Sequence, residues 1–423
     1  MGTASAGPRV RAFRVVVALS ALAAMTLLSA PSVGATTIVP PDVWSSESGG
    51  GGNAATNAGE HVITAATAVQ LKQAWKLTTP SGAARAPAIV NGVIYHAYNS
   101  ALGLPDRLVA ASAKTGATLW STTLPGDTQF TGRDYTYGLT VVGNLALMPY
   151  SGWWQAAGIV AVNITTHKVA WSASEPNAPS NGQPSHPMVV DSGRAYVYNY
   201  EGNLLYAFRV SDGKLLWHVK SPVVYIAGTA AVGGVLYVSD EKYGGTVALN
   251  GATGTKLWST PIGSNLPVVA GGRLIAASGQ YVAAANTSGC GQSTCPWQWR
   301  DRVPGAEWIS VGGADANTVF VTATIGTSPR VGVIERLSAV TGKVQWSAAL
   351  PPFPGSPVRI GNTVWLISYA DTLIGFSTTA TKATPLRSIK IADNNMQQIA
   401  GANGTLVVFT WTAGLTGYRI PGT

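Results

Sequence analysis

One short phrase recurs along the chain and limits what it can fold into. It reads "SAKTGATLW" at 112–120, "RVSDGKLLW" at 209–217, "LNGATGTKLW" at 249–258 and "SAVTGKVQW" at 338–346. In each copy a Thr-Gly or Asp-Gly pair lies between two apolar stretches, and glycine lets the backbone reach a positive φ and reverse as a hairpin. The chain is therefore built from repeated β-hairpins, each ending in a strand that carries tryptophan.

Weaker copies of the phrase fill the gaps between these four. "GIVAVNITTHKVAW" ends at Trp171 with His167 in the place of glycine, and "CPWQWRDRV" carries Trp299 with Cys295 in that place. In "TKATPLRSIKI" an arginine, Arg387, replaces the tryptophan, and "LKQAWKLTTP" carries Trp75 with no hairpin before it. The anchor positions are 41 to 51 residues apart, at 75, 120, 171, 217, 258, 299, 346 and 387.

A second set of turns gives an independent count of the repeat. Each turn opens a strand, and the marks are Gly92, Asn144, Gly193, Gly234, Gly272, Asn317, Asn362 and Gly404. Two hairpins per unit, or four strands in about 45 residues, are typical of a β-propeller blade. The sequence therefore predicts an all-β fold, an eight-bladed β-propeller of four-stranded antiparallel blades.

The two ends of the chain predict how the ring closes. "TLVVFTW" and "LTGYRI" have the pattern of middle strands in an incomplete eighth blade, and the N-terminal "LKQAWKLT" would supply its outer strand. Joining the ends leaves no bare sheet edge at the seam. A solenoid is the structural alternative, and it would leave two ends that need polar caps.

The repeated tryptophans are expected to fill the gaps between neighbouring blades. A blade lies between two others, so both of its faces are buried and a large side chain on its outer strand can pack against the next blade. We expect this docking role for Trp75, Trp120, Trp171, Trp217, Trp258, Trp299 and Trp346.

The first 35 residues have the order of a secretory signal peptide. Three arginines and no acid precede the apolar run at 15–29, and small residues end at Ala35. The run is short for a membrane span, and an uncleaved anchor is the alternative interpretation. The expected organisation is a signal peptide at 1–35, a Gly-rich lead-in segment at 36–65 and a single propeller domain at 66–423.

Charge argues against some classes of partner. Removing the signal peptide lowers the formal net charge from +9 to +6, and only 11% of residues are charged. No basic run or basic helix is present, so neither nucleic acid nor membrane insertion after signal removal is expected. The expected product is a monomer that is secreted, extracellular or held in the cell envelope of a bacterium.

The chain has only two cysteines, Cys290 and Cys295. Exported proteins meet an oxidising environment, so we expect these two to form a disulfide. They lie where the third and fourth strands of blade five should turn, and the bond is expected to be a local loop staple.

The repeated phrase resembles that of a known family. The "A-x-x-x-T-G-x-x-x-W" pattern resembles the tryptophan-docking repeat of pyrroloquinoline quinone (PQQ)-like eight-bladed propellers, and the chain looks most like secreted bacterial PQQ-like repeat proteins. Residues 42–77, with Trp44 and Trp75, are similar to the segment that leads into that propeller. The resemblance covers about 42–423 and implies a quinoprotein-like ring. The wider family holds dehydrogenases, a barrel-assembly scaffold and proteins of unassigned role, so function has to be argued from a site.

The dehydrogenase branch of the family implies a quinone clamped above the ring axis by adjacent bonded cysteines, a stacked tryptophan, a calcium ion and a carboxylate base. This sequence departs from that pattern, because Cys290 and Cys295 are not adjacent and no Asp-x-Asp calcium loop is present. Its five histidines lack metal-ligand spacing, and it has no G-x-S-x-G motif. No cofactor, metal or catalytic residue is therefore expected. PQQ with calcium belongs to the alternative function, a PQQ-dependent oxidoreductase with an altered pocket.

One face of the ring is expected to carry function. Loops between second and third strands share a face with the loops that join blades, and loops 125–138 and 149–158 are longer than a turn needs. "GWW" at 152–154 also adds two large aromatic residues that the repeat does not require. The candidate binding residues are Asp134, Tyr135, Tyr150, Trp153, Trp154, Glu201, Asp240 and Lys242.

The favoured function is that of a secreted, non-catalytic binding or scaffold propeller. Tryptophan and tyrosine flanked by acids and amides suit stacking on sugars or anchoring of a peptide. We expect the long-loop face to engage an extracellular protein, peptide or glycan. The structural alternative is that these aromatic residues only cap the ring.

Overall fold

The computed structural model describes residues 1–2, 42–46, 48–78, 87–98, 106–125, 133–134, 138–152, 157–176, 188–223, 225–242, 244–263, 266–391, 398–410 and 414–423. The chain divides into two compact units, Met1–Val39 and Pro40–Thr423. In the described part of the second unit, every regular element is a strand except one short 3-10 helix, η1 (Ala68–Gln70).

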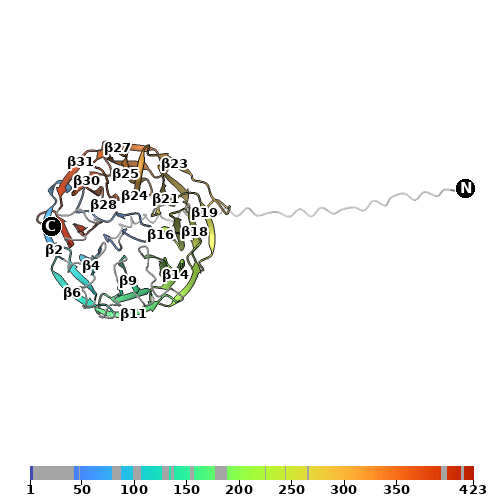
Figure 1. The fold of residues 1–423 in the computed structure, drawn as a ribbon, viewed down its shortest axis with the longest axis horizontal. Helices are drawn as coiled ribbons and strands as arrows, with labels where there is room; N and C mark the ends of the chain where they lie inside the picture. The colour runs from blue at the N-terminus through green and yellow to red at the C-terminus, as the bar shows by residue number, and fades with distance from the viewer. Residues whose placement is uncertain are drawn as a thin grey trace, which may run out of the picture. The chain divides into compact units, whose positions relative to one another are not determined.

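The unit Pro40–Thr423 is an eight-bladed β-propeller (Figure 1), and the predicted fold class is confirmed. Its eight sheets stand side by side around a ring, and six of them are four-stranded. The other two each carry one additional short strand. These are β1 (Thr56–Asn57), beside blade seven, and β7 (Arg133–Asp134), beside blade two.

In blades one to seven the strands run from inner to outer in chain order, and blade eight takes its outer strand from the N-terminal part of the unit. Blade one consists of β3 (Ala88–Val90), β4 (Val93–Tyr98), β5 (Arg107–Ser112) and β6 (Thr118–Thr123), and blade two of β8 (Thr140–Val142), β9 (Leu145–Gly152), β10 (Gly158–Asn163) and β11 (Lys168–Ser174). Blade three consists of β12 (Val189–Asp191), β13 (Arg194–Asn199), β14 (Leu204–Arg209) and β15 (Leu215–Lys220), and blade four of β16 (Ile226–Val232), β17 (Val235–Asp240), β18 (Thr246–Asn250) and β19 (Lys256–Thr260). Blade five consists of β20 (Val268–Ala270), β21 (Arg273–Ser278), β22 (Tyr281–Asn286) and β23 (Trp299–Arg302), and blade six of β24 (Ala306–Gly312), β25 (Thr318–Ile325), β26 (Val331–Ser338) and β27 (Val344–Leu350). Blade seven consists of β28 (Val358–Ile360), β29 (Thr363–Ser368), β30 (Thr372–Ser377) and β31 (Pro385–Lys390), and blade eight of β32 (Gln398–Ala402), β33 (Thr405–Thr410), β34 (Gly414–Arg419) and β2 (Lys72–Leu77).

The N-terminal strand β2 closes the ring as the sequence predicts. It pairs antiparallel with β34, with Lys72 opposite Arg419 and Leu77 opposite Leu415. Figure 1 shows β2 beside the C-terminus of the chain. Blade eight therefore has the same four-stranded order as its neighbours, and its outer edge is paired rather than bare.

The repeated phrase is explained by contacts between successive blades. The indole of Trp171 lies against Gly213 of the next blade, where an added Cβ would approach the ring to 2.5 Å. Its Nε1 donates a hydrogen bond to the carbonyl of Val210, at 3.1 Å. The same packing joins Trp75 to Gly116, Trp217 to Gly254, Trp258 to Gly289 and Trp299 to Gly342. Glycine in one copy thus leaves the room that tryptophan of the preceding copy fills.

Two of the docking positions differ from this pattern. Trp120 stacks on His167, which replaces glycine at φ 59°, with ring centroids 4.3 Å apart. Trp346 lies between Phe320 and Phe376, each with a centroid distance of 5.9 Å. Both tryptophans still contact aromatic side chains, so the docking role extends to the copies that lack the glycine partner.

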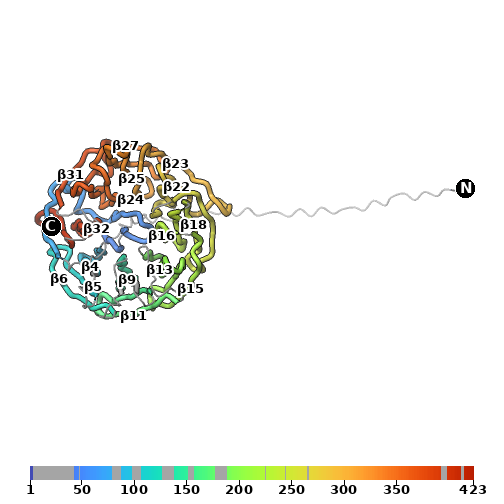
Figure 2. The backbone as a smooth tube through the Cα atoms, in the orientation of Figure 1, coloured from blue at the N-terminus to red at the C-terminus, as the bar shows by residue number. Residues whose placement is uncertain are grey.

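The lead-in segment lies inside the ring, where Figure 2 shows the N-terminal tube passing between the blades. Its backbone carbonyls accept hydrogen bonds from amides of inner strands or the turns next to them. The carbonyls of Ser45, Gly51, Gly52, Ala54 and Ala55 accept from the amides of Val141, Ala231, Val269, Ala314 and Arg359, respectively. A Cβ at Gly51 would lie 2.5 Å from the carbonyl of Val190, so the glycine-rich composition permits this close approach.

The ring has two faces that differ in their connections. The turn face carries the turns between first and second strands and between third and fourth strands, which include the long hairpin between β22 and β23. The loop face carries the remaining connections. The lead-in segment bonds to inner-strand residues next to the turns between first and second strands. It therefore lies at the turn-face end of the inner strands, while the blades' longer connections gather on the loop face.

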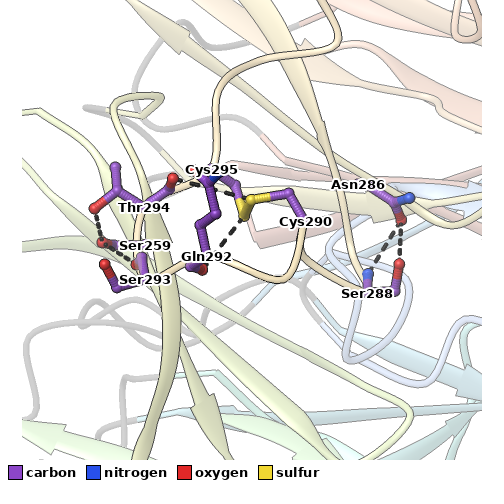
Figure 3. The surroundings of a disulfide bond; sticks show 8 residues. All are labelled: Ser259, Asn286, Ser288, Cys290, Gln292, Ser293, Thr294 and Cys295. Atoms are coloured by element: carbon purple, nitrogen blue, oxygen red, sulfur yellow. Dashed lines mark hydrogen bonds between the residues drawn. A yellow bond between two sulfur atoms is a disulfide. The ribbon is translucent and has the colours of Figure 1, made fainter.

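The expected disulfide between Cys290 and Cys295 is present (Figure 3). It lies in the hairpin between β22 and β23, as predicted. The hairpin also binds blade four, because the amide of Cys295 donates to the carbonyl of Ser259 at 2.7 Å. Trp258 packs against Gly289, which lies at the start of this long hairpin. The docking glycine of blade five is therefore Gly289, and Cys295 does not stand in its place as the sequence alignment suggested.

We expect oxidised protein to have a mass two hydrogens below that of the reduced chain. Replacing Cys290 and Cys295 together by serine should lower the free energy of unfolding by about 2 kcal/mol, because the closed loop is small. Thiol titration and urea denaturation measure the two effects. Two free thiols in freshly exported protein would contradict the pairing.

Candidate binding face

Two aromatic clusters lie on the loop face. The first, the Tyr225 cluster, consists of Tyr200, Tyr225 and Lys242. The rings of Tyr200 and Tyr225 have centroids 6.1 Å apart, and the ammonium nitrogen of Lys242 lies 5.6 Å from the centroid of Tyr225. Tyr200 is 46% exposed, so the ring of an aromatic residue is presented to solvent beside a positive charge.

The second, the Phe353 cluster, consists of Arg330, Phe353 and Tyr369. The rings of Phe353 and Tyr369 have centroids 5.7 Å apart, and the guanidinium carbon of Arg330 lies 5.2 Å from the centroid of Phe353. Arg330 also forms an ion pair with Glu307, at 2.8 Å. The next residue, Trp308, is 70% exposed at the loop-face end of the inner strand β24, and Tyr369 is 61% exposed.

The two clusters share one construction. In each, an aromatic residue of the loop joining two blades accepts a backbone hydrogen bond from the loop after the second strand of the following blade. The amide of Glu241 donates to the carbonyl of Tyr225 at 2.8 Å, and the amide of Tyr369 donates to the carbonyl of Phe353 at 3.2 Å. The side chain of Tyr225 or Phe353 at the centre of each cluster is flanked by a second aromatic ring and by a cation. The two clusters lie three blades apart around the propeller.

The structure describes the side chains of four of the predicted binding residues. Glu201 and Lys242 are exposed on the loop face, and Lys242 belongs to the Tyr225 cluster. Asp240 is buried, and its carboxylate accepts a hydrogen bond from the amide of Lys242 at 2.8 Å, so it shapes the loop that carries that lysine. Tyr150 is completely buried, and its hydroxyl donates to the carbonyl of Ala173 at 3.3 Å.

Of the remaining predicted residues, the structure describes only Asp134. Asp134 belongs to β7, which pairs with β9. Tyr135, Trp153 and Trp154 lie outside the described residues. The structure therefore brings Lys242 and Glu201 to the loop face, with Asp240 buried at the start of the loop that carries Lys242. It places Tyr150 in the hydrophobic core, with its hydroxyl beside Ala173 of β11.

The Phe353 cluster was missed from the sequence. Trp308 carried a signal, since it is a tryptophan outside the docking positions, as Trp153 and Trp154 are. Phe353 gave no comparable signal, because its role depends on a positive φ of 54° and on its distance from Tyr369. Neither the backbone angle nor the distance can be derived from the repeated sequence motif.

A buried acid lies beneath the loop face between blades two and three. Glu175 is only 1% exposed, and its Oε2 accepts a hydrogen bond from the side-chain Nδ2 of Asn199 at 2.8 Å. Its other carboxylate oxygen has no hydrogen-bond partner among the described residues. Burial raises the pKa of Glu175 to about 7, and the hydrogen bond from Asn199 opposes that rise.

We expect replacement of Glu175 by glutamine to stabilise the protein above pH 7. Because the folded-state pKa lies above the unfolded value, the wild-type carboxyl contributes stability below pH 4.5 that is lost as the pH rises towards 7. Glu175→Gln should remove this loss, raising the free energy of unfolding by up to about 3 kcal/mol at pH 8. Urea denaturation at pH 5 and pH 8 measures the difference. Glu201→Gln, which also removes a negative charge from this face, is the control, and parallel pH profiles for wild type and Glu175→Gln would contradict this account.

The described residues do not contain the quinone clamp that the dehydrogenase branch of the family implies. The Cys290–Cys295 bond lies on the hairpin before the outer strand of blade five, away from the ring axis. Nowhere in the part of the chain that the structure describes do three His, Cys, Asp or Glu side chains come together as metal ligands. No quinone chemistry is therefore assigned to particular residues.

Comparison with known proteins agrees with the ring and its docking phrases. A family model described as outer membrane protein assembly factor BamB matches residues 41–220 and 155–294. The chain belongs to this family. BamB-like proteins are PQQ-like repeat propellers, so the predicted family is confirmed.

Solved structures share the fold at low sequence identity. Quinohemoprotein alcohol dehydrogenase from Comamonas testosteroni is 11% identical, with a TM-score of 0.64 over 90% of this chain and 81% of its own. BamB from Moraxella catarrhalis is 13% identical, with a TM-score of 0.58 over 82% of this chain and 99% of its own. A scaffold and a dehydrogenase thus share this architecture, so the fold alone does not choose between them.

A curated relative is the tetrathionate hydrolase of Acidithiobacillus ferrooxidans. It is 26% identical over 306 residues, which cover 67% of this chain and 53% of the hydrolase. The chain spans about half the length of this relative. In the present chain, no helix among the described residues is long and apolar enough to cross a membrane.

Proposed function

We propose that this chain is an exported, non-catalytic binding or scaffold propeller that engages a protein, peptide or glycan through its loop face. The observation that carries the proposal is the pair of like-built clusters around Tyr225 and Phe353. Exposed aromatic rings beside cations supply large, rigid contact area at low entropic cost, which suits stacking on sugars or anchoring of a polypeptide.

Exposure of these rings is costly unless a partner covers them. Trp308, Tyr369 and Tyr200 present apolar surface on one face of the ring, and aromatic patches of this kind are enriched where proteins bind partners. Their separation by three blades would let one extended partner contact both clusters. This favours an extended glycan or polypeptide over a compact small molecule.

The sequence also supports export as part of the proposal. Residues 1–35 have the order of a signal peptide, and the family description names an outer membrane protein assembly factor. A location in the cell envelope or outside the cell follows, and there the chain would act as a monomer that binds no nucleic acid. The oxidising environment would also permit the Cys290–Cys295 bond.

Partner capture by purified protein tests the proposal. Immobilised wild type, Trp308→Ala/Tyr369→Ala and Tyr200→Ala/Tyr225→Ala are incubated with envelope proteins and polysaccharides of the producing bacterium. We expect each double variant to lose at least about tenfold of the captured partner, on the scale of hot-spot aromatic residues. Val340→Ala, an exposed site on the turn face, is the matched control.

The outcomes separate binding from catalysis. Equal capture by all variants would sink the loop-face proposal. Turnover of an alcohol with added PQQ and calcium, or of tetrathionate, would replace it by an enzymatic function related to the quinoprotein or hydrolase relatives. Unchanged melting temperatures are required, because a drop would assign the aromatic residues to packing.

A further inference from the structure

Blade five departs from the repeat at one position of its outer strand. The residue directly after the docking position is serine in five blades: Ser121, Ser172, Ser259, Ser347 and Ser388. Blade five has Arg300 there. Blade three has His218 and blade eight has Lys76 at this place, so the five serine blades are the reference with which Arg300 is compared.

The residues across the sheet from Arg300 are also unusual. Arg300 lies opposite Ala283, which lies opposite Ala276. The matching pairs in other blades are larger, for example Met148 with Val160, Val197 with Tyr206, Val238 with Val247 and Leu366 with Ile374. Two small side chains replace two large ones, so blade five has a hollow at this point.

The hollow is a pocket of about 120 Å³ between blades four and five. Ile262, Ala276 and Ala283 provide apolar walls, and Tyr281, Trp297 and Arg300 also line it. An apolar cavity of about 150 Å³ accommodates benzene in another protein, so this volume suits a group of a few heavy atoms.

Arg300 is held by two aromatic rings. Its guanidinium carbon lies 4.3 Å from the ring centroid of Tyr281 and 4.7 Å from that of Trp297. No ion pair or hydrogen bond joins the side chain of Arg300 to another described residue. Its N–H groups therefore remain available to a ligand, and a planar guanidinium matches the two oxygens of a carboxylate.

The long hairpin of blade five fixes Trp297 beside the arginine. The amide of Gln298 donates to the carbonyl of Ala284 at 2.6 Å, and the amide of Cys295 donates to Ser259 of blade four at 2.7 Å. The disulfide closes the same hairpin (Figure 3). Trp297 is nevertheless 39% exposed, so its ring is both anchored and accessible.

We propose that this pocket binds a carboxylate that carries a short apolar group. The carboxylate would pair with the edge of the Arg300 guanidinium, and the apolar group would lie against Ala276, Ala283 and Ile262. Two sources share this chemistry: a free branched-chain acid, and the C-terminal residue of a polypeptide. The site is separate from the loop-face clusters and does not depend on the proposed function.

Calorimetric titration of the full mature chain with isovalerate tests the proposal. We expect saturable binding that isovaleramide, the uncharged analogue, does not reproduce. Arg300→Gln should weaken binding at least tenfold, and Ala283→Leu should abolish it by filling the pocket. Arg302→Gln is the matched control, since Arg302 lies two residues along the same strand and donates to Gln280 at 3.0 Å.

A second pair of probes distinguishes the two sources. Gly-Gly-Gly-Val with a free C-terminus should bind more tightly than isovalerate if polypeptide ends are the ligand, and its C-terminal amide should not bind. Weaker binding of the peptide than of isovalerate assigns the site to free acids.

Three results would overturn the carboxylate site. These are absence of saturable binding by both probes, binding by Arg300→Gln equal to wild type, and equally effective competition by sulfate. Melting curves accompany each variant. Because Arg300 is exposed, its replacement tests binding even if Ala283→Leu fails to fold.

Discussion

A chain lacking residues 66–80 is expected to lose the cooperative unfolding of the whole ring. The deletion removes β2, which pairs with β34 from Lys72 opposite Arg419 to Leu77 opposite Leu415. Blade eight would expose a bare edge, and Gly116 of blade one would lose the indole of Trp75. We expect destabilisation beyond the 4–5 kcal/mol that marks exceptional single substitutions.

Thermal melting and dye binding measure this loss, and a rescue variant controls for it. Moving residues 66–80 to follow Thr423 should restore the transition, because Lys72 already lies opposite Arg419 near the C-terminus. The moved strand would complete blade eight as the last hairpin of the chain. A truncated protein with an unchanged melting temperature would contradict closure by β2.

The second large effect is expected at a docking tryptophan. Trp299 is 8% exposed, and its Nε1 donates to the carbonyl of Ala339 at 2.9 Å. Trp299→Ala would leave an empty volume against Gly342 and should cost about 3–5 kcal/mol of unfolding free energy. Trp308→Ala is the control, since Trp308 lies nine residues later on the loop face and its loss should change stability by less than about 0.5 kcal/mol.

Urea denaturation of the two variants separates packing from surface roles. Equal losses would show that Trp308 is also a packing residue and would remove it from the binding face. A small loss at Trp299 would contradict the docking role that we assign to the repeated phrase.

The sequence predicted the fold because the repeat reports packing directly. Glycine and tryptophan in copies such as Trp171 and Gly213 contact one another across blades, so each copy describes an interface that occurs around the ring. The closing strand was equally readable, because Trp75 stood without a hairpin before it. Eight similar units left few other ways to bury so many two-sided strands.

The binding face was only partly predictable. Lys242 was found from loop composition, whereas Tyr225 and Phe353 were not, because their clusters form between loops far apart in the sequence. The position of the lead-in segment was also hidden, since Gly51 and Gly52 gave no sign of the inner-strand amides that they meet. A repeat defines neighbouring blades well and defines contacts across several blades poorly.

Residue-level footprinting of the complex with the captured partner tests the central claim most directly. Hydroxyl-radical labelling with and without partner reports the solvent access of each aromatic side chain. We predict protection of Tyr200, Trp308 and Tyr369 on the loop face, with no change at Val340 on the turn face. Protection confined to Val340 and the other turn-face residues, with the three loop-face rings still labelled, would contradict the claim that the loop face is the binding surface.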